Sequence, residues 1–172
     1  VTLLEAGGKD WNPWIHIPIG YGKTIVDPNL NWRYETEKGA EIGNRPMYWP
    51  RGKVLGGSSS INGLLYIRGQ ARDYDHWRQL GNEGWSYDDV LPYFRKAESQ
   101  ENGADEFHGD GGPLRVSNLR ERNPLCQAFI ESAVDAGIPR NDDFNGASQE
   151  GVGFYQITTR NARRCSAAVA YL

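Results

Sequence analysis

The sequence predicts an α/β or α+β fold. Short apolar segments alternate with longer segments in which apolar residues recur at helical spacing, and loops rich in glycine and proline separate them. The 172 residues suffice for one domain with a sizeable core. The chain has no initial Met, opens at once on an apolar segment and stops inside a helical pattern. We therefore expect an internal piece of a longer protein, truncated at both ends.

Composition limits the partners. A net charge of −3 without any basic run indicates neither a nucleic-acid partner nor an anionic membrane surface. No apolar run approaches the roughly 18 residues of a membrane-spanning helix. Two cysteines, Cys126 and Cys165, are too few for a disulfide framework or a cysteine-based metal site. We expect a reducing, cytoplasmic setting and no metal, and a peripheral membrane association of the full-length protein stays open.

In the first part of the chain, residues 1–4 are apolar and β-rich, which predicts a buried strand of a parallel sheet. Residues 9–31 lack any period and contain proline, glycine and tryptophan, which is typical of a functional loop. Residues 32–36 and 45–49 alternate and predict a hairpin. Residues 56–67 predict a glycine turn that opens into a short buried helix.

Local signals predict the helices and strands that follow. A helix is expected over residues 71–80. Ser86 and Asp89 have the spacing of a reciprocal N-terminal cap, which predicts a helix to about Glu98.

Towards the end of the chain, residues 113–116 and 152–159 predict strands. Asn123 followed by Pro124 marks the start of another helix, and Ser166 caps the last one.

Glu5 is the first candidate for chemistry. It directly follows the apolar segment and precedes Ala-Gly-Gly. In the second strand of a dinucleotide-binding fold, an acid at this place accepts hydrogen bonds from the adenosine ribose. The glycine fingerprint of such a fold would lie about 20 residues earlier, before the first residue of this chain. The alternative is a surface carboxylate at a strand end.

Residues 56–62 read GGSSSIN and form the second candidate. Glycines let backbone N–H groups approach a ligand, serine hydroxyls add donors, and a following helix N-terminus suits a phosphate. Asn62 can both donate and accept a hydrogen bond. A flexible linker does not have the apolar flanks seen here, and the spacing is not that of a Walker loop. The pattern favours a backbone cradle for a ligand.

The longer stretch GKVLGGSSSINGLLYIRG, residues 52–69 running on to Asp75, resembles the first signature of the glucose–methanol–choline (GMC) oxidoreductases. These are flavoproteins that oxidise alcohols. Further segments resemble the same family in the same order: LLEAG at Leu3, WSY at Trp85, PYFRKAE at Pro92, FHG at Phe107, GPL at Gly112 and RCSAA at Arg164. The resemblance covers essentially the full chain and is closest to the choline dehydrogenase-like bacterial branch.

The resemblance implies part of a Rossmann-like FAD-binding domain with the start of the substrate-binding domain. Residues 1–172 would be an incomplete FAD-binding domain without its first strand and GxGxxG turn. Residues 51–69 would be the flavin cradle and 70–150 helical and loop insertions, and 151–172 would lead into the substrate-binding region. Some relatives have a covalently flavinylated histidine where this chain has Ile61, so we expect non-covalent FAD.

The resemblance also implies roles for individual residues. Glu5 would hold the adenosine ribose, the loop over residues 51–60 would pass the pyrophosphate and ribityl chain, and Val54 with residues 62–65 would contact the flavin, largely through the backbone. The expected cofactor-binding residues are Glu5, Arg51, Val54, Gly56, Gly57, Ser58, Ser59, Asn62, Gly63, Leu64 and Leu65.

No catalytic residue is expected in this chain. In the family, a histidine paired with a second histidine or an asparagine lies further towards the C-terminus and assists removal of the hydroxyl proton. His16, His76 and His108 lack a second base at any suggestive spacing. The acidic pairs 142–143 and 105–106 lack an oxygen-rich loop of the calcium-binding kind, so we expect solvated surface there rather than a metal site.

The expected function is FAD-dependent oxidation of an alcohol to an aldehyde, with the present chain alone inactive. The alternative is a non-catalytic flavin-binding or structural relative without the catalytic base. An NAD-binding dehydrogenase half is permitted by Glu5 alone but disfavoured by the cradle segment. The expected partner is a small-molecule alcohol. Its identity, the electron acceptor, the choice between oxidase and dehydrogenase, and the oligomeric state stay open.

Overall fold

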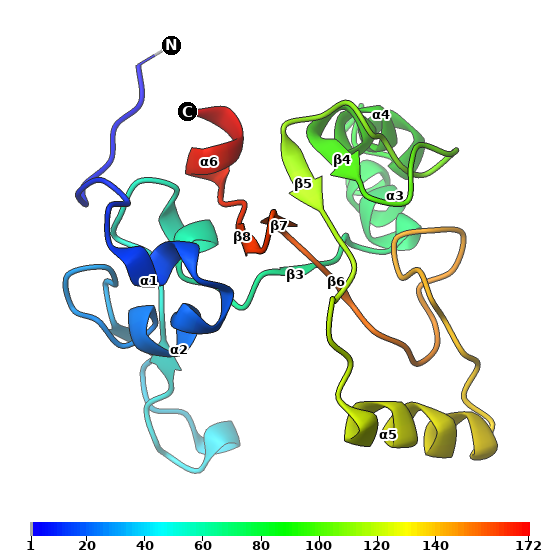
Figure 1. The fold of residues 1–172 in the computed structure, drawn as a ribbon, viewed down its shortest axis with the longest axis horizontal. Coiled ribbons are helices and arrows are strands. Elements are labelled where there is room, and N and C mark those ends of the chain that lie inside the picture. The colour runs from blue at the N-terminus through cyan, green and yellow to red at the C-terminus, as the bar shows by residue number, and fades with distance from the viewer. Residues whose placement is uncertain (1) are drawn as a thin grey trace. The chain divides into compact units, whose positions relative to one another are not determined.

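The computed structural model describes residues 2–172 and divides into two compact units. The first unit consists of the chain up to Leu64 together with Thr159–Leu172, and the second of Leu65–Thr158 (Figure 1). Helices and short strands are mixed in both units, which confirms the predicted α/β or α+β class. The units are described separately below.

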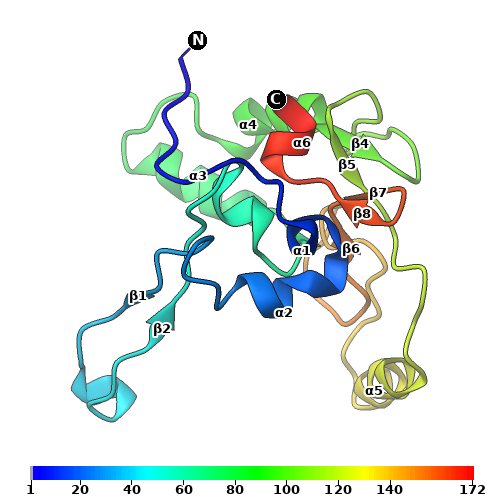
Figure 2. The ribbon, with the colours of Figure 1, turned by 60° about the vertical axis from the view of Figure 1, so that its left-hand side comes forward.

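The first unit consists of short elements joined by long loops. They are α1 (Pro13–His16), η1 (Pro18–Gly20), α2 (Tyr21–Thr24), β1 (Tyr34–Glu35), η2 (Ala40–Ile42), β2 (Tyr48–Trp49), η3 (Gly57–Ser60), β7 (Thr159–Arg160), β8 (Arg163–Arg164) and α6 (Ala167–Tyr171), where η marks a 3₁₀-helix. Strands β1 and β2 pair antiparallel, as do β7 and β8. The β1–β2 hairpin protrudes from α1 and α2 in both views (Figures 1 and 2).

The core of the first unit is small and apolar. Ile15, Leu30, Val54 and Ile61 are buried against one another. Asn31 braces the loops around this core, because its side-chain oxygen accepts hydrogen bonds from the backbone N–H groups of Arg33 and Arg51, both at 2.9 Å. The buried Asn31 amide thus satisfies backbone N–H groups that strand pairing would satisfy in a sheet. These hydrogen bonds keep a loop without periodic structure ordered.

Of two expectations for the first unit, one is confirmed and one is wrong. The hairpin over residues 32–49 is confirmed, with Tyr34 opposite Trp49. The buried strand over residues 1–4 is wrong: Val1 lies outside the described residues, Thr2–Leu4 form no strand, and Leu4 is 90% exposed. An apolar segment becomes a buried strand only beside paired neighbours, and the first such contact here is a single parallel bridge from Gly8 to Val54.

The second unit contains the longer helices. Its elements are β3 (Leu65–Tyr66), α3 (Ala71–Gln79), α4 (Tyr87–Ala97), β4 (Glu98–Gln100), β5 (Leu114–Val116), α5 (Pro124–Asp135) and β6 (Gln156–Ile157). Strands β3 and β6 pair antiparallel, and β4 and β5 pair parallel. In both views α5 stands at the end of long connections, away from α3 and α4 (Figures 1 and 2).

The helices of the second unit begin where the capping residues predict. The Ser86 hydroxyl accepts from the backbone N–H of Asp89, and the Asp89 carboxylate accepts from the backbone N–H of Ser86. Asn123 caps α5, whose first residue is Pro124. The predicted helices over 71–80 and from Ser86 to about Glu98 are therefore confirmed.

Three further expectations are wrong or only partly right. Residues 56–67 form the 3₁₀-turn η3 and then strand β3, not a buried helix, because Leu64 adopts a left-handed φ of 66° that ends any helical continuation. The strand over 152–159 is reduced to β6 and the start of β7. Within residues 2–172 the strands form four two-stranded sheets and no extended parallel sheet.

A buried ionic cluster occupies the interior of the second unit. We call Arg68, Glu98, His108 and Asp143 the ionic cluster. Glu98 is fully buried and accepts from the Arg68 guanidinium at 2.7 Å, and His108 Nδ1 lies 3.0 Å from the same carboxylate oxygen. His108 Nε2 lies 2.9 Å from the half-buried carboxylate of Asp143. Two cations therefore face two carboxylates, which satisfies charges that would otherwise be costly to bury.

The ionic cluster corrects one expectation: Asp143 is half-buried beside His108 and is not simply solvated surface. The two residues lie 35 positions apart, so no local spacing in the sequence could pair them. The hydrogen bonds that the protonated His108 ring donates to the carboxylates of Asp143 and Glu98 raise the pKa of His108 to about 9.

Among residues 2–172, no helix has both the length and the apolar character that crossing a membrane requires.

The ionic cluster makes stability depend on pH. The pKa of His108 is raised on folding, so its contribution is fully present below about pH 6.5 and is lost as the pH rises through about 9. We expect the free energy of unfolding to fall by on the order of 2–3 kcal/mol across this window, and His108→Gln to remove that fall. Denaturant titrations of both proteins across the window measure it. His76→Gln, an exposed control on α3, should keep the wild-type profile; the same fall in His108→Gln would contradict the assignment.

Candidate functional site

The candidate site is the loop over residues 51–64 in the first unit, which we call the cradle. Two buried apolar residues anchor it to the core, Val54 before the glycine turn and Ile61 after it. The backbone N–H of Leu55 donates to the Gly8 carbonyl at 2.9 Å, which brings the segment after Glu5 alongside the cradle. Gly7 and Lys53 are in such close contact that a Cβ on Gly7 would lie 2.0 Å from the Lys53 carbonyl oxygen.

The turn of the cradle requires glycine for two reasons. Gly56 and Gly57 have left-handed φ values of 90° and 57°, which side chains other than glycine rarely adopt. A Cβ on Gly56 would collide with the Ser60 hydroxyl at 2.5 Å, so this glycine serves packing. A Cβ on Gly57 or Gly63 would meet no atom within 4 Å. The backbone at these two positions is therefore open to a ligand.

The three serines brace the cradle from within. Ser60 is buried and donates to the Leu55 carbonyl at 2.8 Å. Ser59 donates to the Gly56 carbonyl at 2.6 Å and accepts from the backbone N–H of Ala167, at the start of α6, at 2.8 Å. Ser58 accepts from the backbone N–H of Gly52 at 3.1 Å. The hydroxyl protons of Ser59 and Ser60 are therefore used inside the loop, and the expectation that these hydroxyls serve as ligand donors stays a prediction.

Arg164 joins the cradle to the C-terminal strand β8. Its Nε donates to the Ile15 carbonyl at 2.7 Å, and its Nη1 donates to the Ser59 carbonyl at 3.1 Å and to the Asn62 side-chain oxygen at 2.7 Å. Asn62 in turn accepts from the backbone N–H of Leu64 at 3.0 Å. Sequence reasoning missed this arginine, although it stands in the RCSAA segment that carries part of the family resemblance.

The charged residues expected at the site lie near the cradle with their side chains exposed. The Glu5 carboxylate accepts from the backbone N–H of Gly7 at 2.7 Å, which folds the carboxylate back on its own turn. The Arg51 guanidinium donates to the Pro50 carbonyl and lies 5.3 Å from the centre of the Trp49 ring. Leu65 belongs to the second unit, where it pairs with Ile157 in the β3–β6 ladder.

The donor set of the cradle suits an anionic, flat ligand bound through the backbone. Without a Cβ at Gly57 and Gly63, a ligand can approach the loop backbone closely, although the Gly57 N–H itself donates to the Val54 carbonyl at 2.7 Å. The buried Arg164 guanidinium adds a positive charge beneath the loop, and its Nη2 is a buried donor without a partner among the described residues. These features fit a phosphate-containing aromatic cofactor such as FAD.

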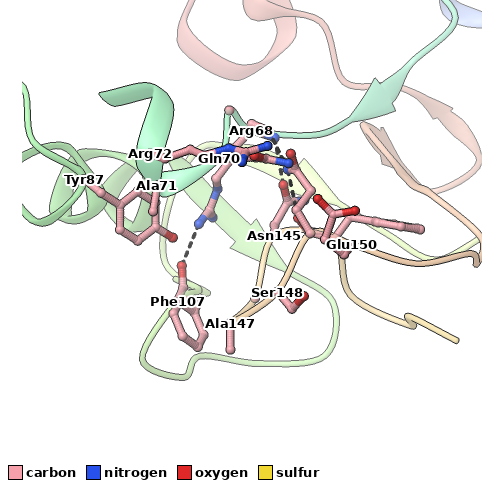
Figure 3. Close-up of a pocket in the computed structure, with 14 residues that line it drawn as sticks. Arg68, Gln70, Ala71, Arg72, Tyr87, Phe107, Asn145, Ala147, Ser148 and Glu150 are labelled. Atoms are coloured by element: carbon pink, nitrogen blue, oxygen red, sulfur yellow. Dashed lines mark hydrogen bonds between the residues drawn. The ribbon is translucent and has the colours of Figure 1, made fainter. Parts of the chain in front are cut away.

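A second hollow lies in the second unit and has a volume of about 330 Å³. Figure 3 shows Arg68, Gln70 and Arg72 on one side of it and the loop from Asn145 to Glu150 on the other. Its polar groups are largely bonded to one another: Arg68 Nη1 donates to the Phe107 carbonyl at 2.8 Å, and the Asn145 side chain accepts from the Arg68 backbone N–H at 2.7 Å. The hollow therefore lies at a junction of loops that are hydrogen-bonded to one another.

The remaining candidates bring no catalytic group together. His16 Nε2 lies 2.7 Å from the Asp10 carbonyl oxygen, and His76 lies on the exposed surface of α3. Neither Cys126 nor Cys165 forms a disulfide within residues 2–172. In the part of the chain that the structure describes, no three His, Cys, Asp or Glu side chains are grouped to hold a metal ion.

Comparison with known proteins places this geometry in a family. The chain is 46% identical over 173 residues to an alcohol dehydrogenase [acceptor] of Pseudomonas putida, covering 100% of this chain and 31% of that protein. It is 47% identical over 172 residues to an oxygen-dependent choline dehydrogenase of Sinorhizobium fredii, with 100% and 31% coverage. A crystal structure of pyridoxine 4-oxidase from Mesorbium loti matches with a TM-score of 0.91 at 34% identity and covers 97% of this chain and 33% of that one.

The chain thus spans about a third of the length of the curated relatives it matches. The sequence model described as GMC oxidoreductase matches residues 19–172, which include the cradle, most of its unit and the whole second unit. The resemblance inferred from the signature is confirmed: the chain belongs to the GMC oxidoreductase family.

Proposed function

We propose that this chain holds FAD at the cradle and serves an enzyme that oxidises a small alcohol to an aldehyde. FAD is the cofactor of the GMC oxidoreductases. The observation that carries the proposal is the open glycine backbone at Gly57 and Gly63, set in a loop whose own hydroxyls and anchors are already satisfied. A loop braced in this way keeps a defined shape, and the open Cβ positions of Gly57 and Gly63 leave room for a ligand against its backbone.

The residues of the chain would bind FAD mainly through the backbone. Peptide N–H groups of Gly56 and Ser58 would bind the pyrophosphate, since backbone amides around a left-handed turn form an anion-binding concavity, whereas the Gly57 N–H already donates to the Val54 carbonyl at 2.7 Å. Ser59 would contribute by fixing that turn, and Arg51 lies at its beginning. The exposed carboxylate of Glu5 would leave its contact with the Gly7 backbone N–H to accept hydrogen bonds from the ribose.

Val54 and residues 62–65 would border the flavin ring. Val54 is fully buried and supports the loop from below, while Asn62 and Gly63 are exposed. Ile61 is buried and carries no nucleophile, so the flavin would be held without a covalent bond at this position. When bound, FAD supplies the hydride acceptor, and the part of the chain described here supplies binding and orientation.

The proton of the alcohol would be taken by a base outside these residues. Each of the three histidines is placed elsewhere: His16 on a backbone carbonyl, His76 on a helix surface and His108 inside the ionic cluster. The relatives named above act on alcohols and choline, so a small alcohol, including choline, is the substrate class we propose. The domain boundaries at residues 51–69, 70–150 and 151–172 and the cytoplasmic setting stay predictions, and the electron acceptor stays open.

The proposed function predicts a flavoprotein. We expect the full-length protein to purify with FAD, and acid precipitation to release the flavin because the bond is non-covalent. Anaerobic addition of an alcohol should bleach the visible absorbance of the oxidised flavin. A panel of primary alcohols with choline, and the corresponding aldehydes as controls, identifies the substrate. A protein that binds FAD but is bleached by no alcohol would favour the non-catalytic relative, and one that binds no FAD would refute the proposal.

A matched pair of glycine substitutions tests the cradle. Gly57 and Gly43 both have left-handed φ values, 57° and 67°, and a Cβ on either meets nothing within 4 Å. Alanine costs a similar amount of stability at both, about 1–2 kcal/mol, because both lose the freedom of glycine. We expect only Gly57→Ala to weaken FAD binding, by at least about tenfold, since its Cβ enters the ligand's space. Fluorescence titration of the apoprotein with FAD measures both; equal effects on the dissociation constant would contradict the assignment.

A further inference from the structure

Arg164 has an environment that stability alone does not explain. Its side chain is 1% exposed, and its three hydrogen bonds all go to uncharged oxygens: the carbonyls of Ile15 and Ser59 and the amide oxygen of Asn62. The donor Nη2 is buried and has no partner within residues 2–172. Burial lowers the pKa of this guanidinium to about 10, which reflects the cost of a buried charge without a facing carboxylate.

Arg68 provides an internal comparison. It is also buried, but its guanidinium is 2.7 Å from the fully buried carboxylate of Glu98. A buried arginine that serves folding is normally paired in this way, because an unpaired buried donor or charge is costly. Arg68 therefore faces a carboxylate that neutralises its charge, whereas Arg164 faces only uncharged oxygens. This difference indicates that Arg164 has a role other than charge pairing.

The contacts of Arg164 lead directly to the strained part of the cradle. Leu64 is a buried leucine with a φ of 66°, a conformation that is unfavourable for a side chain other than glycine, asparagine or aspartate. Its backbone N–H is held by the Asn62 side-chain oxygen, and that same oxygen accepts from Arg164 Nη1. Strain of this kind persists only where the surroundings fix it, and it gathers at ligand sites.

We propose that Arg164 is a positioning residue for the flavin, acting through Asn62 to hold residues 62–64 in the conformation that faces the cofactor. This inference rests on the proposed function of the cradle. One nitrogen of the guanidinium, Nη1, donates both to the Ser59 carbonyl and to the Asn62 side-chain oxygen. It therefore fixes both ends of the segment after the glycine turn. Its planar fork also reaches Ile15 in α1, so the segment is positioned relative to the core and not merely to its neighbours.

The test compares Arg164→Met with Arg163→Met in the full-length protein. Arg163 is the exposed neighbour of Arg164 in β8, so its substitution removes a charge at the same strand without touching the cradle. We expect Arg164→Met to weaken FAD binding by at least about tenfold and to change the visible circular dichroism of the flavin that remains bound. Arg163→Met should leave both unchanged. Asn62→Ala, which keeps the Ile15 and Ser59 contacts, should reproduce the effect if Arg164→Met does not fold.

A double-mutant cycle separates positioning from a general loss of stability. Glycine adopts the φ of Leu64 without strain, so Leu64→Gly removes the need for a clamp. In the Leu64→Gly background we expect Arg164→Met to weaken FAD binding by less than about threefold, instead of tenfold or more. The melting temperature of each variant is measured in parallel to report stability.

The outcomes distinguish this inference from the proposed function. If the wild-type protein binds FAD while folded Arg164→Met keeps the same FAD dissociation constant and flavin dichroism, Arg164 is only structural and the inference is overturned. Equal effects of Arg164→Met in the two Leu64 backgrounds would also overturn it. A wild-type protein that binds no FAD refutes the proposed function itself.

Discussion

The guanidinium of Arg164 joins three segments that lie far apart in the sequence. It reaches α1 across 149 residues, the Ser59 carbonyl across 105 and the Asn62 side chain across 102. The apolar core beneath these contacts consists of Ile15, Leu30, Val54 and Ile61, which is little for a unit with such short strands. Hydrogen bonds from buried polar side chains therefore order loops that no extended sheet supports, and Asn31 does the same for the loops on the other flank of the core.

In the second unit, paired buried charges order the loops. Glu98 is fully buried between Arg68 and His108, and His108 also reaches Asp143, so the loops around residues 107 and 143 are fixed to strand β4. Such a cluster depends on every member, because removal of one leaves a buried charge uncompensated. The cluster holds the start of β4, and a bridge from Ser117 to Ile157 extends the short parallel pair of β4 and β5 at its other end.

The sequence was informative where structure is set locally. The caps at Ser86, Asn123 and Ser166 predicted helix starts correctly, because a capping side chain bonds to backbone within three residues. The hairpin was predicted from alternation for a similar reason. The cradle was located from its glycines and its signature, but the use of Ser59 and Ser60 inside the loop was not, and neither Arg164 nor the ionic cluster was found. Contacts across 30 to 149 residues leave no periodic mark in a single sequence.

The internal use of the serine hydroxyls changes how the cradle should be understood. Hydroxyls aimed at a phosphate would compete with water when the ligand is absent, and the loop would reorganise on binding. Here Ser59 and Ser60 donate to backbone carbonyls, and Arg164 fixes Asn62, so the loop has a defined shape on its own. The entropy of ordering the loop is then lost during folding and not during binding. What remains for a cofactor is the open backbone at Gly57 and Gly63, a surface that is selective by shape.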